Sequence, residues 1–140
     1  MARVMALRDA FAYFNGAKGA NPRWSWSARS PDGRTVVVTL WDDRISDDGK
    51  TVVADLFRDE YRHLWRNKPG NKERIENLKL ARDHCDGLFR VVMITPKDRR
   101  ARPRSIAKRY PHPTLVMKLV ELDEETGQFR AESRPGAIRA

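Results

Sequence analysis

The sequence predicts an α+β domain built on a strongly curved antiparallel sheet, or a small pseudobarrel, with an N-terminal helix and one internal helix. Three observations lead to this class. Helical periodicity occurs in two separate segments, strand patterns occupy most of the remaining chain, and two turn sequences join neighbouring strands as hairpins. Strands and helices do not alternate regularly, so a doubly wound parallel sheet is not expected.

Length and composition bound the number of domains. The chain has 140 residues, of which 40% are hydrophobic, and this is enough apolar material for one core. Two domains would each be too small to bury a core easily. We expect a single domain over residues 1–133 and a flexible C-terminal tail over residues 134–140.

The first helix is predicted over residues 3–14. Val4, Leu7, Phe11 and Phe14 recur at helical spacing, which places them on one face. The Asn-Gly pair that follows is typical of a helix end.

A hairpin is predicted next. In residues 24–29 the apolar side chains of Trp24 and Trp26 alternate with serines, as in a strand with one apolar face. A Ser-Pro-Asp-Gly turn then leads to residues 35–41, an apolar and β-branched run that is typical of a central strand.

The middle of the chain carries an acidic loop over residues 42–50 and a short strand over residues 51–56. Residues 57–70 fit either a helix or a loop, and the Lys-Pro-Gly sequence at their end is expected to stop that segment. Asn71 is an acceptable N-cap for the internal helix, which Gly87 ends.

The last third is predicted to complete the sheet. Residues 88–95 form a nearly all-apolar strand, and residues 115–122 and 128–132 form a second hairpin around an acidic turn. The segment 97–109 lies between them and is expected to be extended, because Pro103 prevents a helix from continuing through it.

The charge balance favours nucleic acid as a partner. The chain has 28 Lys and Arg residues against 19 Asp and Glu residues, a net charge of +9, and 20 of the cations are Arg. Guanidinium groups suit phosphate binding and stacking on bases. Residues 97–109 contain seven basic residues and one acidic residue, which is far above the density of the rest of the chain.

We predict that this Arg-rich loop contacts the phosphates of DNA or RNA. An extended backbone would spread its side chains along the surface. The alternative is a solvated loop whose charges serve solubility alone. The predicted phosphate contacts are Arg99, Arg100, Arg102, Arg104, Lys108 and Arg109.

Three of the four tryptophans lie in the first predicted hairpin. They would form either a packed aromatic core, which is the usual place of a large apolar side chain, or one wall of an aromatic pocket. Such a pocket, with a carboxylate at its rim, could hold a flipped base, including a modified one. The predicted base pocket consists of Trp24, Trp26, Trp41 and Asp42, with Asp43 as the alternative carboxylate.

The sequence predicts no catalytic residue, metal site or cofactor, and a non-catalytic domain is the preferred interpretation. Asp32, Asp48 and Lys50 match the spacing of a PD…DxK nuclease, in which carboxylates hold a divalent metal, but they lie in turn sequences. A metal-dependent nuclease or related hydrolase is the alternative function. The three scattered histidines and Cys85 do not have the spacing of metal ligands.

The expected location is cytoplasmic, without a membrane. No apolar run approaches the roughly 20 residues that a membrane span needs, and the N-terminal residues lack the apolar region of a secretory signal. A single cysteine excludes an internal disulfide framework. The basic composition also fits a protein-interaction module that binds an acidic partner, which is the second alternative function.

The apolar segment 87–94, the basic segment after it, and the Tyr-Pro-His-Pro sequence at 110–113 before the strand 115–122 resemble the PUA-like superfamily, which includes EVE, YTH and SRA domains. The resemblance covers the chain from Trp24 to Phe129 and lies in the order of elements. It implies a small pseudobarrel that binds RNA or DNA and, in several members, holds a modified base in an aromatic cage. It also implies that the three hairpin tryptophans are the cage positions to test and that the Arg-rich loop contacts the nucleic-acid backbone.

Overall fold

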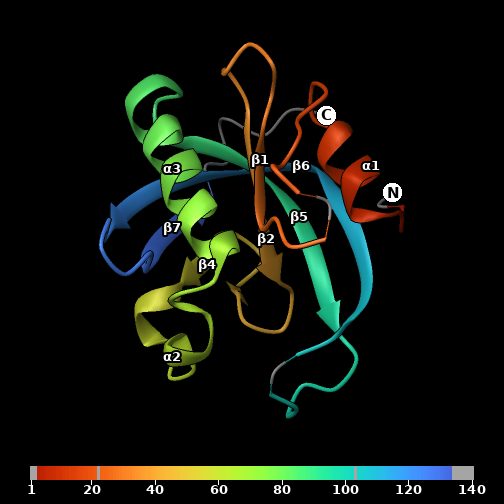
Figure 1. Ribbon diagram of the computed structural model, residues 1–140. Coiled ribbons are helices and arrows are strands. Elements are labelled where there is room, and N and C mark those ends of the chain that lie inside the picture. The colour runs from red at the N-terminus through yellow and green to blue at the C-terminus, as the bar shows by residue number, and fades with distance from the viewer. Residues whose placement is uncertain (1–2, 22, 103, 134–140) are drawn as a thin grey trace.

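A computed structural model describes residues 3–21, 23–102 and 104–133, and it contains one mixed sheet with helices packed against it (Figure 1). The predicted tail over residues 134–140 lies outside the described residues. The helices are α1 (Leu7–Ala12), a 3₁₀ turn η1 (Leu56–Arg58), α2 (Arg62–Trp65) and α3 (Pro69–His84). The strands are β1 (Ser27–Arg29), β2 (Val36–Trp41), β3 (Ser46–Asp47), β4 (Val52–Asp55), β5 (Leu88–Pro96), β6 (Ile106–Leu122) and β7 (Phe129–Ser133).

The seven strands form one sheet in the order β1-β2-β5-β6-β7-β4-β3. The predicted α+β class, with an N-terminal helix and an internal one, is confirmed. So are both predicted hairpins, since β1 pairs with β2 and β6 with β7 in antiparallel fashion. The described strands β1 and β3 end the sheet without pairing with each other, so these strands do not close it into a barrel.

One pair of strands departs from the predicted antiparallel sheet. The strands β2 and β5 lie side by side in parallel, with Val38 opposite Val91. Parallel neighbours need a long connection, and here residues 42–87, which include α3, provide it. Both strands are apolar on both faces, as buried parallel strands are. Their nearly all-apolar composition indicates burial on both faces, which does not by itself decide between parallel and antiparallel pairing.

The core lies on both faces of the central strands. Because side chains alternate along a strand, Val36 and Val38 point to the face covered by α3, where they join Leu78. Val37 points to the opposite face and joins Phe11 of α1. The two helices with predicted apolar stripes therefore cover opposite faces of the same sheet.

The internal helix begins earlier than predicted. Pro69 is its first residue and Lys68 occupies the N-cap position, so the Lys-Pro-Gly sequence opens α3 and does not end the preceding segment. Proline fits the first turn of a helix, since the N–H it lacks would have no partner there. Asn71, the predicted N-cap, instead lies inside α3 and is buried.

The second half of the Arg-rich segment belongs to a strand. The strand β6 begins at Ile106, so Lys108 and Arg109 pair with Thr95 and Ile94 of β5, and only the part before Ile106 connects the two strands. The acidic loop 42–50 likewise contains β3, which pairs with β4. No helix among the described residues is both long and apolar enough to cross a membrane.

Candidate functional site

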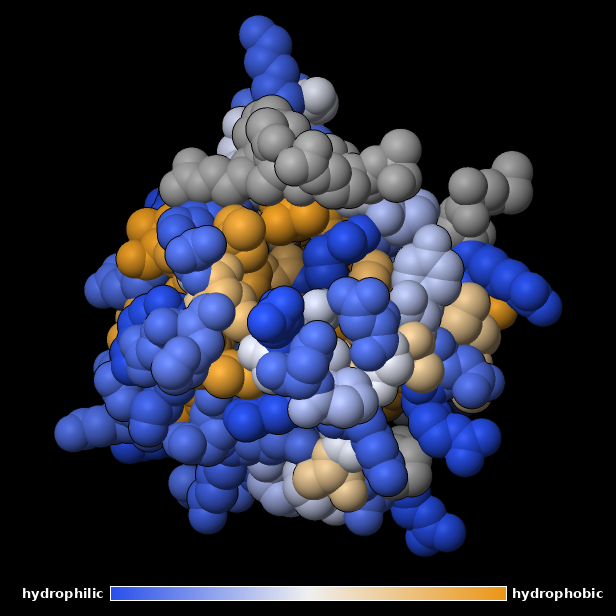
Figure 2. All heavy atoms as spheres, turned by 90° about the horizontal axis from the view of Figure 1, so that it is seen from above, coloured by the Kyte–Doolittle hydropathy of each residue, from blue (hydrophilic) through white to orange (hydrophobic). Residues whose placement is uncertain are grey.

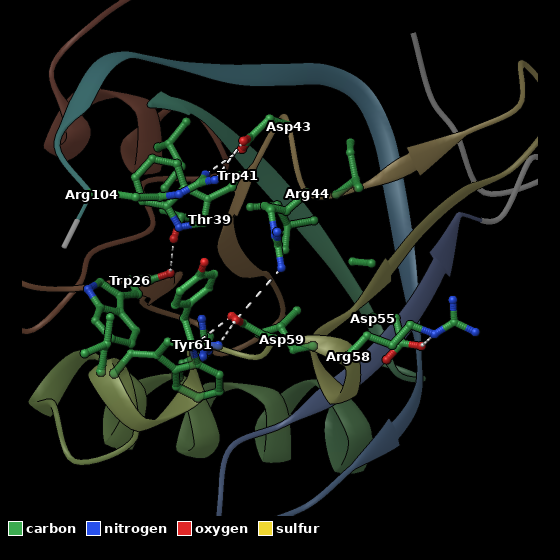
Figure 3. A pocket seen from close by; sticks show the side chains of 18 of the residues that line it. Trp26, Thr39, Trp41, Asp43, Arg44, Asp55, Arg58, Asp59, Tyr61 and Arg104 are labelled. Carbon is green, nitrogen blue, oxygen red and sulfur yellow. Dashed lines mark hydrogen bonds and ion pairs between the residues drawn. The ribbon is translucent and has the colours of Figure 1, made fainter. Parts of the chain in front are cut away.

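A cavity of about 750 Å³ lies at the end of the sheet where the connection after β2, the helix α2 and the β5–β6 connection come together (Figures 1 and 3). This volume is within the usual range of small-molecule pockets. Its floor comes from β2 and its walls come from segments far apart in the sequence. Trp26, Trp41, Tyr61, Trp65, Arg74, Arg102 and Arg104 are among the residues that line it.

The walls of the pocket are aromatic. Trp26 and Trp41 flank the first hairpin and Tyr61 and Trp65 belong to the segment around α2, and all four side chains are half-buried. Figure 3 shows Trp26, Trp41 and Tyr61 around the same space. Trp26 and Trp41 therefore border a cavity, as the pocket hypothesis requires. Residues 57–70 supply a further wall of this cavity.

Trp24, the third predicted pocket residue, is not among the lining residues. The strand β1 starts only at Ser27, so the alternation expected over residues 24–29 does not hold at its beginning. The carbonyl of Trp26 accepts hydrogen bonds from both the N–H and the hydroxyl of Thr39, which fixes Trp26 beside β2. Trp24 lacks this anchor, and its N–H donates instead to the carbonyl of Asn21.

Of the two predicted candidate carboxylates, Asp43, the alternative, borders the pocket and Asp42 does not. The carboxylate of Asp42 accepts hydrogen bonds from the hydroxyls of Thr95 and Tyr110. Burial, together with the negative charge of Asp42, raises the pKa of the Tyr110 phenol above its ordinary value. Asp42 therefore holds β5 and β6 together next to the pocket.

Asp43 forms a buried ion pair with Arg104. The two terminal nitrogens of Arg104 lie 2.6 and 2.8 Å from the two carboxylate oxygens, and the guanidinium carbon lies 4.9 Å from the ring centroid of Trp41. Burial acts to raise the pKa of Asp43, but the hydrogen bonds and charge of Arg104 outweigh it, so this pKa is lower than usual. Arg104 is only 7% exposed, which makes it a structural partner of the pocket wall.

Arg102 closes the pocket on the other side. Its guanidinium carbon lies 4.1 Å from the ring centroid of Tyr61, which is stacking distance for a cation on an aromatic ring. Its Nη1 donates to the carbonyls of Arg99 and Ala101, so the connection folds back on itself. The Arg-rich connection thus covers part of the pocket and does not run along the surface as an extended stripe.

Three of the four remaining predicted phosphate contacts are exposed. Arg99 is 78% exposed and reaches Asp43 only at 3.6 Å, and Arg100 and Lys108 are also exposed. Arg109 is half-buried, and its Nε is buried without a hydrogen-bond partner among the described residues. The six predicted residues therefore divide into a pocket pair, Arg102 and Arg104, and an exposed group of Arg99, Arg100 and Lys108, with Arg109 between them.

Arg74 is, beside Tyr61 and Trp65, a functional candidate that was not among the predicted site residues. Arg74 of α3 lines the cavity although only 6% of it is exposed. Its guanidinium carbon lies 5.1 Å from the ring centroid of Trp26, 5.1 Å from that of Trp65 and 5.4 Å from that of Phe129. Burial lowers the pKa of Arg74 to about 10, although the charge of Asp59 acts in the opposite direction. It is therefore still charged at neutral pH.

A signal for Arg74 was present in the sequence. Arg74 precedes Leu78 by four residues, and such residues lie on the same helix face. Leu78 belongs to the predicted apolar stripe of the internal helix and is fully buried. A charged residue on that stripe indicates either a buried polar contact or a functional role.

The residues of the nuclease alternative do not come together in one site. Asp32 accepts hydrogen bonds from Ser30 and Arg34 within its own turn, and Asp48 accepts them from Lys50 and Thr51 within another. Within residues 3–21, 23–102 and 104–133, no group of three or more His, Cys, Asp or Glu side chains is arranged to hold a metal ion.

Comparisons with protein-family models, with curated proteins and with solved structures give no match to this chain.

Proposed function

We propose that this protein is a small non-catalytic nucleic-acid-binding domain that holds a base in the aromatic pocket and contacts phosphates through exposed residues of the Arg-rich connection. The observation that carries the proposal is the combination of four aromatic side chains and several arginines around one cavity of about 750 Å³. Aromatic faces stack on bases whatever their sequence, and arginine binds phosphate and base edges alike.

A polar surface alone would not support this proposal. Hydrophilic residues also cover most of the face seen in Figure 2, which looks onto the end of the molecule opposite the pocket. A polar surface is therefore not particular to the pocket end of this protein. What distinguishes the pocket is that its cations lie beside aromatic rings in a concave site, a combination suited to a flipped or unpaired base.

Different residues have different proposed roles in binding. Trp26, Trp41 and Tyr61 line the cavity and would stack on the base. Arg99 and Arg100 are exposed next to Arg102, which borders the cavity, and they would bind the phosphates on either side of that base. The PUA-like resemblance, which implies an aromatic cage for a base, agrees with this division and remains part of the proposal.

Fluorescence anisotropy tests the proposal. The purified protein is titrated into labelled single- and double-stranded DNA and RNA, plain and with methylated cytosine or adenine, at two salt concentrations. We expect binding that weakens steeply with salt, and we expect the Arg99→Gln/Arg100→Gln variant to reduce the slope of log affinity against log salt by about 1.5. The matched control is Arg34→Gln/Lys50→Gln, which removes two exposed charges in other turns. Absence of binding to every probe at low salt would reject the proposal.

A further inference from the structure

Arg74 is a buried cation without a carboxylate partner. No Asp or Glu oxygen of the described residues lies within 4.0 Å of it, and its only hydrogen bond to them runs from Nη2 to the side-chain oxygen of Asn71, at 3.1 Å. Its Nε is buried and unpartnered. Burying an unpaired charge is costly, and replacing it by an apolar residue would often not harm stability. A costly unpaired charge beside a cavity therefore points to a role in binding.

The surroundings of Arg74 define what it can bind. Trp26, Trp65 and Phe129 lie around the guanidinium at cation–π distance. A guanidinium carries five N–H donors in its plane and no acceptor. Since Asn71 takes up one donor at Nη2, both donors of Nη1 and the second donor of Nη2 are without a described partner. These form the planar terminal fork of the side chain.

Each carboxylate that lines the pocket is already engaged by donors of the protein. Asp43 is engaged by Arg104 and Asp55 by Arg130 and the Phe57 N–H. Asp59 accepts hydrogen bonds from the indole N–H of Trp65 and from the Tyr61 N–H. The fork of Arg74 therefore offers donors without a described partner, while the pocket carboxylates are engaged, so the site next to Arg74 suits a planar ligand whose inserted edge carries acceptors.

We propose that Arg74 is the specificity-determining residue of this pocket and that the base it selects is guanine, whose N7 and O6 accept from the Arg74 fork. This inference rests on the proposed function, because it assumes that the planar ligand is a base. Guanine presents two adjacent acceptors on this edge, whereas adenine presents one acceptor and one donor. An amino group placed against the guanidinium would leave two donors facing each other.

The pocket tryptophans allow a direct measurement. Quenching of tryptophan fluorescence is followed while the full chain is titrated with the 5′-monophosphates of guanosine, inosine, 7-deazaguanosine, adenosine and cytidine. Inosine keeps N7 and O6 but lacks the amino group of guanine, and 7-deazaguanosine lacks N7. We expect guanosine and inosine monophosphates to bind within about threefold of each other, and adenosine and 7-deazaguanosine monophosphates to bind about tenfold more weakly.

Three variants assign the preference to Arg74. Arg74→Met removes the donors at similar volume and Arg74→Lys keeps the charge but loses the planar fork, so both should bring guanosine and adenosine monophosphates to equal affinity. Arg82→Met is the control, since Arg82 lies on the same helix outside the pocket and is exposed. Circular dichroism confirms that each variant is folded. If Arg74→Met does not fold, Arg74→Lys carries the test alone.

The outcomes separate the two proposals. If oligonucleotides bind and adenosine and guanosine monophosphates are equal in the parent protein, the guanine assignment is wrong and the nucleic-acid proposal stands. If ribose 5-phosphate competes as well as guanosine monophosphate, Arg74 binds phosphate and the assignment is overturned. If no oligonucleotide and no mononucleotide binds, the proposed function itself fails.

Discussion

Asp43 and Arg104 are 61 residues apart in the sequence, and both oxygens of the one are hydrogen-bonded by both terminal nitrogens of the other. The pair joins the connection after β2 to the connection between β5 and β6. Both side chains are almost buried, with 11% and 7% exposed. The position of the Arg-rich connection over the pocket therefore depends on this ion pair.

Replacing Asp43 by Asn should destabilise the fold by about 3 kcal/mol, because it leaves the Arg104 guanidinium buried without its counter-charge. Urea denaturation of parent and variant measures this difference. Glu60→Gln is the matched control, since Glu60 is exposed and its side chain has no ion pair among the described residues. A cost of Asp43→Asn as small as that of the control would mean that the ion pair contributes little to stability.

The contribution of this pair should depend on pH with a defined sign. Burial acts to raise the pKa of Asp43, but Arg104 lowers it below the unfolded-state value of about 3.9. The carboxylate therefore stabilises the fold above that pH, and this contribution is lost as the pH falls through the folded-state pKa. The difference in unfolding free energy between parent and Asp43→Asn should shrink below about pH 4, as urea denaturation at a series of pH values would measure. A difference that stays constant down to the acid unfolding of the parent would contradict this assignment.

The three hairpin tryptophans should differ in their effect on binding. Trp26→Leu and Trp41→Leu each remove a pocket wall, so we expect oligonucleotide affinity to fall about tenfold, as the loss of one stacked base does. Trp24→Leu should leave affinity within about twofold, because Trp24 does not line the cavity. Anisotropy titrations of variants that remain folded measure all three. Equal losses at Trp24 and Trp41 would place the binding site elsewhere.

Gly70 positions a pocket wall through its lack of a side chain. A Cβ at this position would lie 2.6 Å from Cδ2 of Trp26 and 2.7 Å from the carbonyl oxygen of Trp24. In most helix positions Gly→Ala stabilises, but here we expect Gly70→Ala to destabilise by about 1–3 kcal/mol through overpacking. Thermal unfolding of this variant against Lys72→Ala, an exposed position two residues along α3, checks the sign. Stabilisation by Gly70→Ala would show that Trp26 can move away without cost.

Stability and binding should respond in opposite directions at Arg74. Arg74→Met removes a buried charge. We therefore expect its free energy of unfolding, measured in urea, to equal that of the parent or to exceed it by up to about 3 kcal/mol. If the variant is instead destabilised by several kcal/mol, the contacts of Arg74 with Trp26, Trp65 and Phe129 are structural, and the presence of Arg74 needs no ligand to explain it.

Local patterns predicted most of the elements of this fold. The helical spacing of Leu7 and Phe11 and the apolar runs around Val37 and Val92 correspond to α1, β2 and β5, but α1 spans only Leu7–Ala12 and not the predicted residues 3–14. The parallel pairing of β2 with β5 depends on how distant segments meet, and both strands would look the same in an antiparallel sheet. The start of α3 was missed because proline can either open or end a helix.

The site was predicted only in part, for a related reason. Trp26 and Trp41 line the pocket, which was one of the two alternatives for the hairpin tryptophans, but the alternation of residues 24–29 also included Trp24, which does not. Asp42 and Asp43 are neighbours in sequence, and only tertiary contacts decide which of them faces Arg104. Arg74 enters the site from a helix, and no short motif contains it together with its aromatic neighbours.

The parallel pairing of β2 with β5 also has a kinetic meaning. All of residues 42–87, which supply Tyr61, Trp65 and Arg74 to the pocket, lie in the loop that this pairing closes. Closing a long loop costs entropy before any contact compensates it, so non-local pairings of this kind form more slowly than hairpins such as β5–β6. The pocket therefore forms only when the two halves of the chain have met, and a ligand that binds it stabilises the whole folded sheet against unfolding.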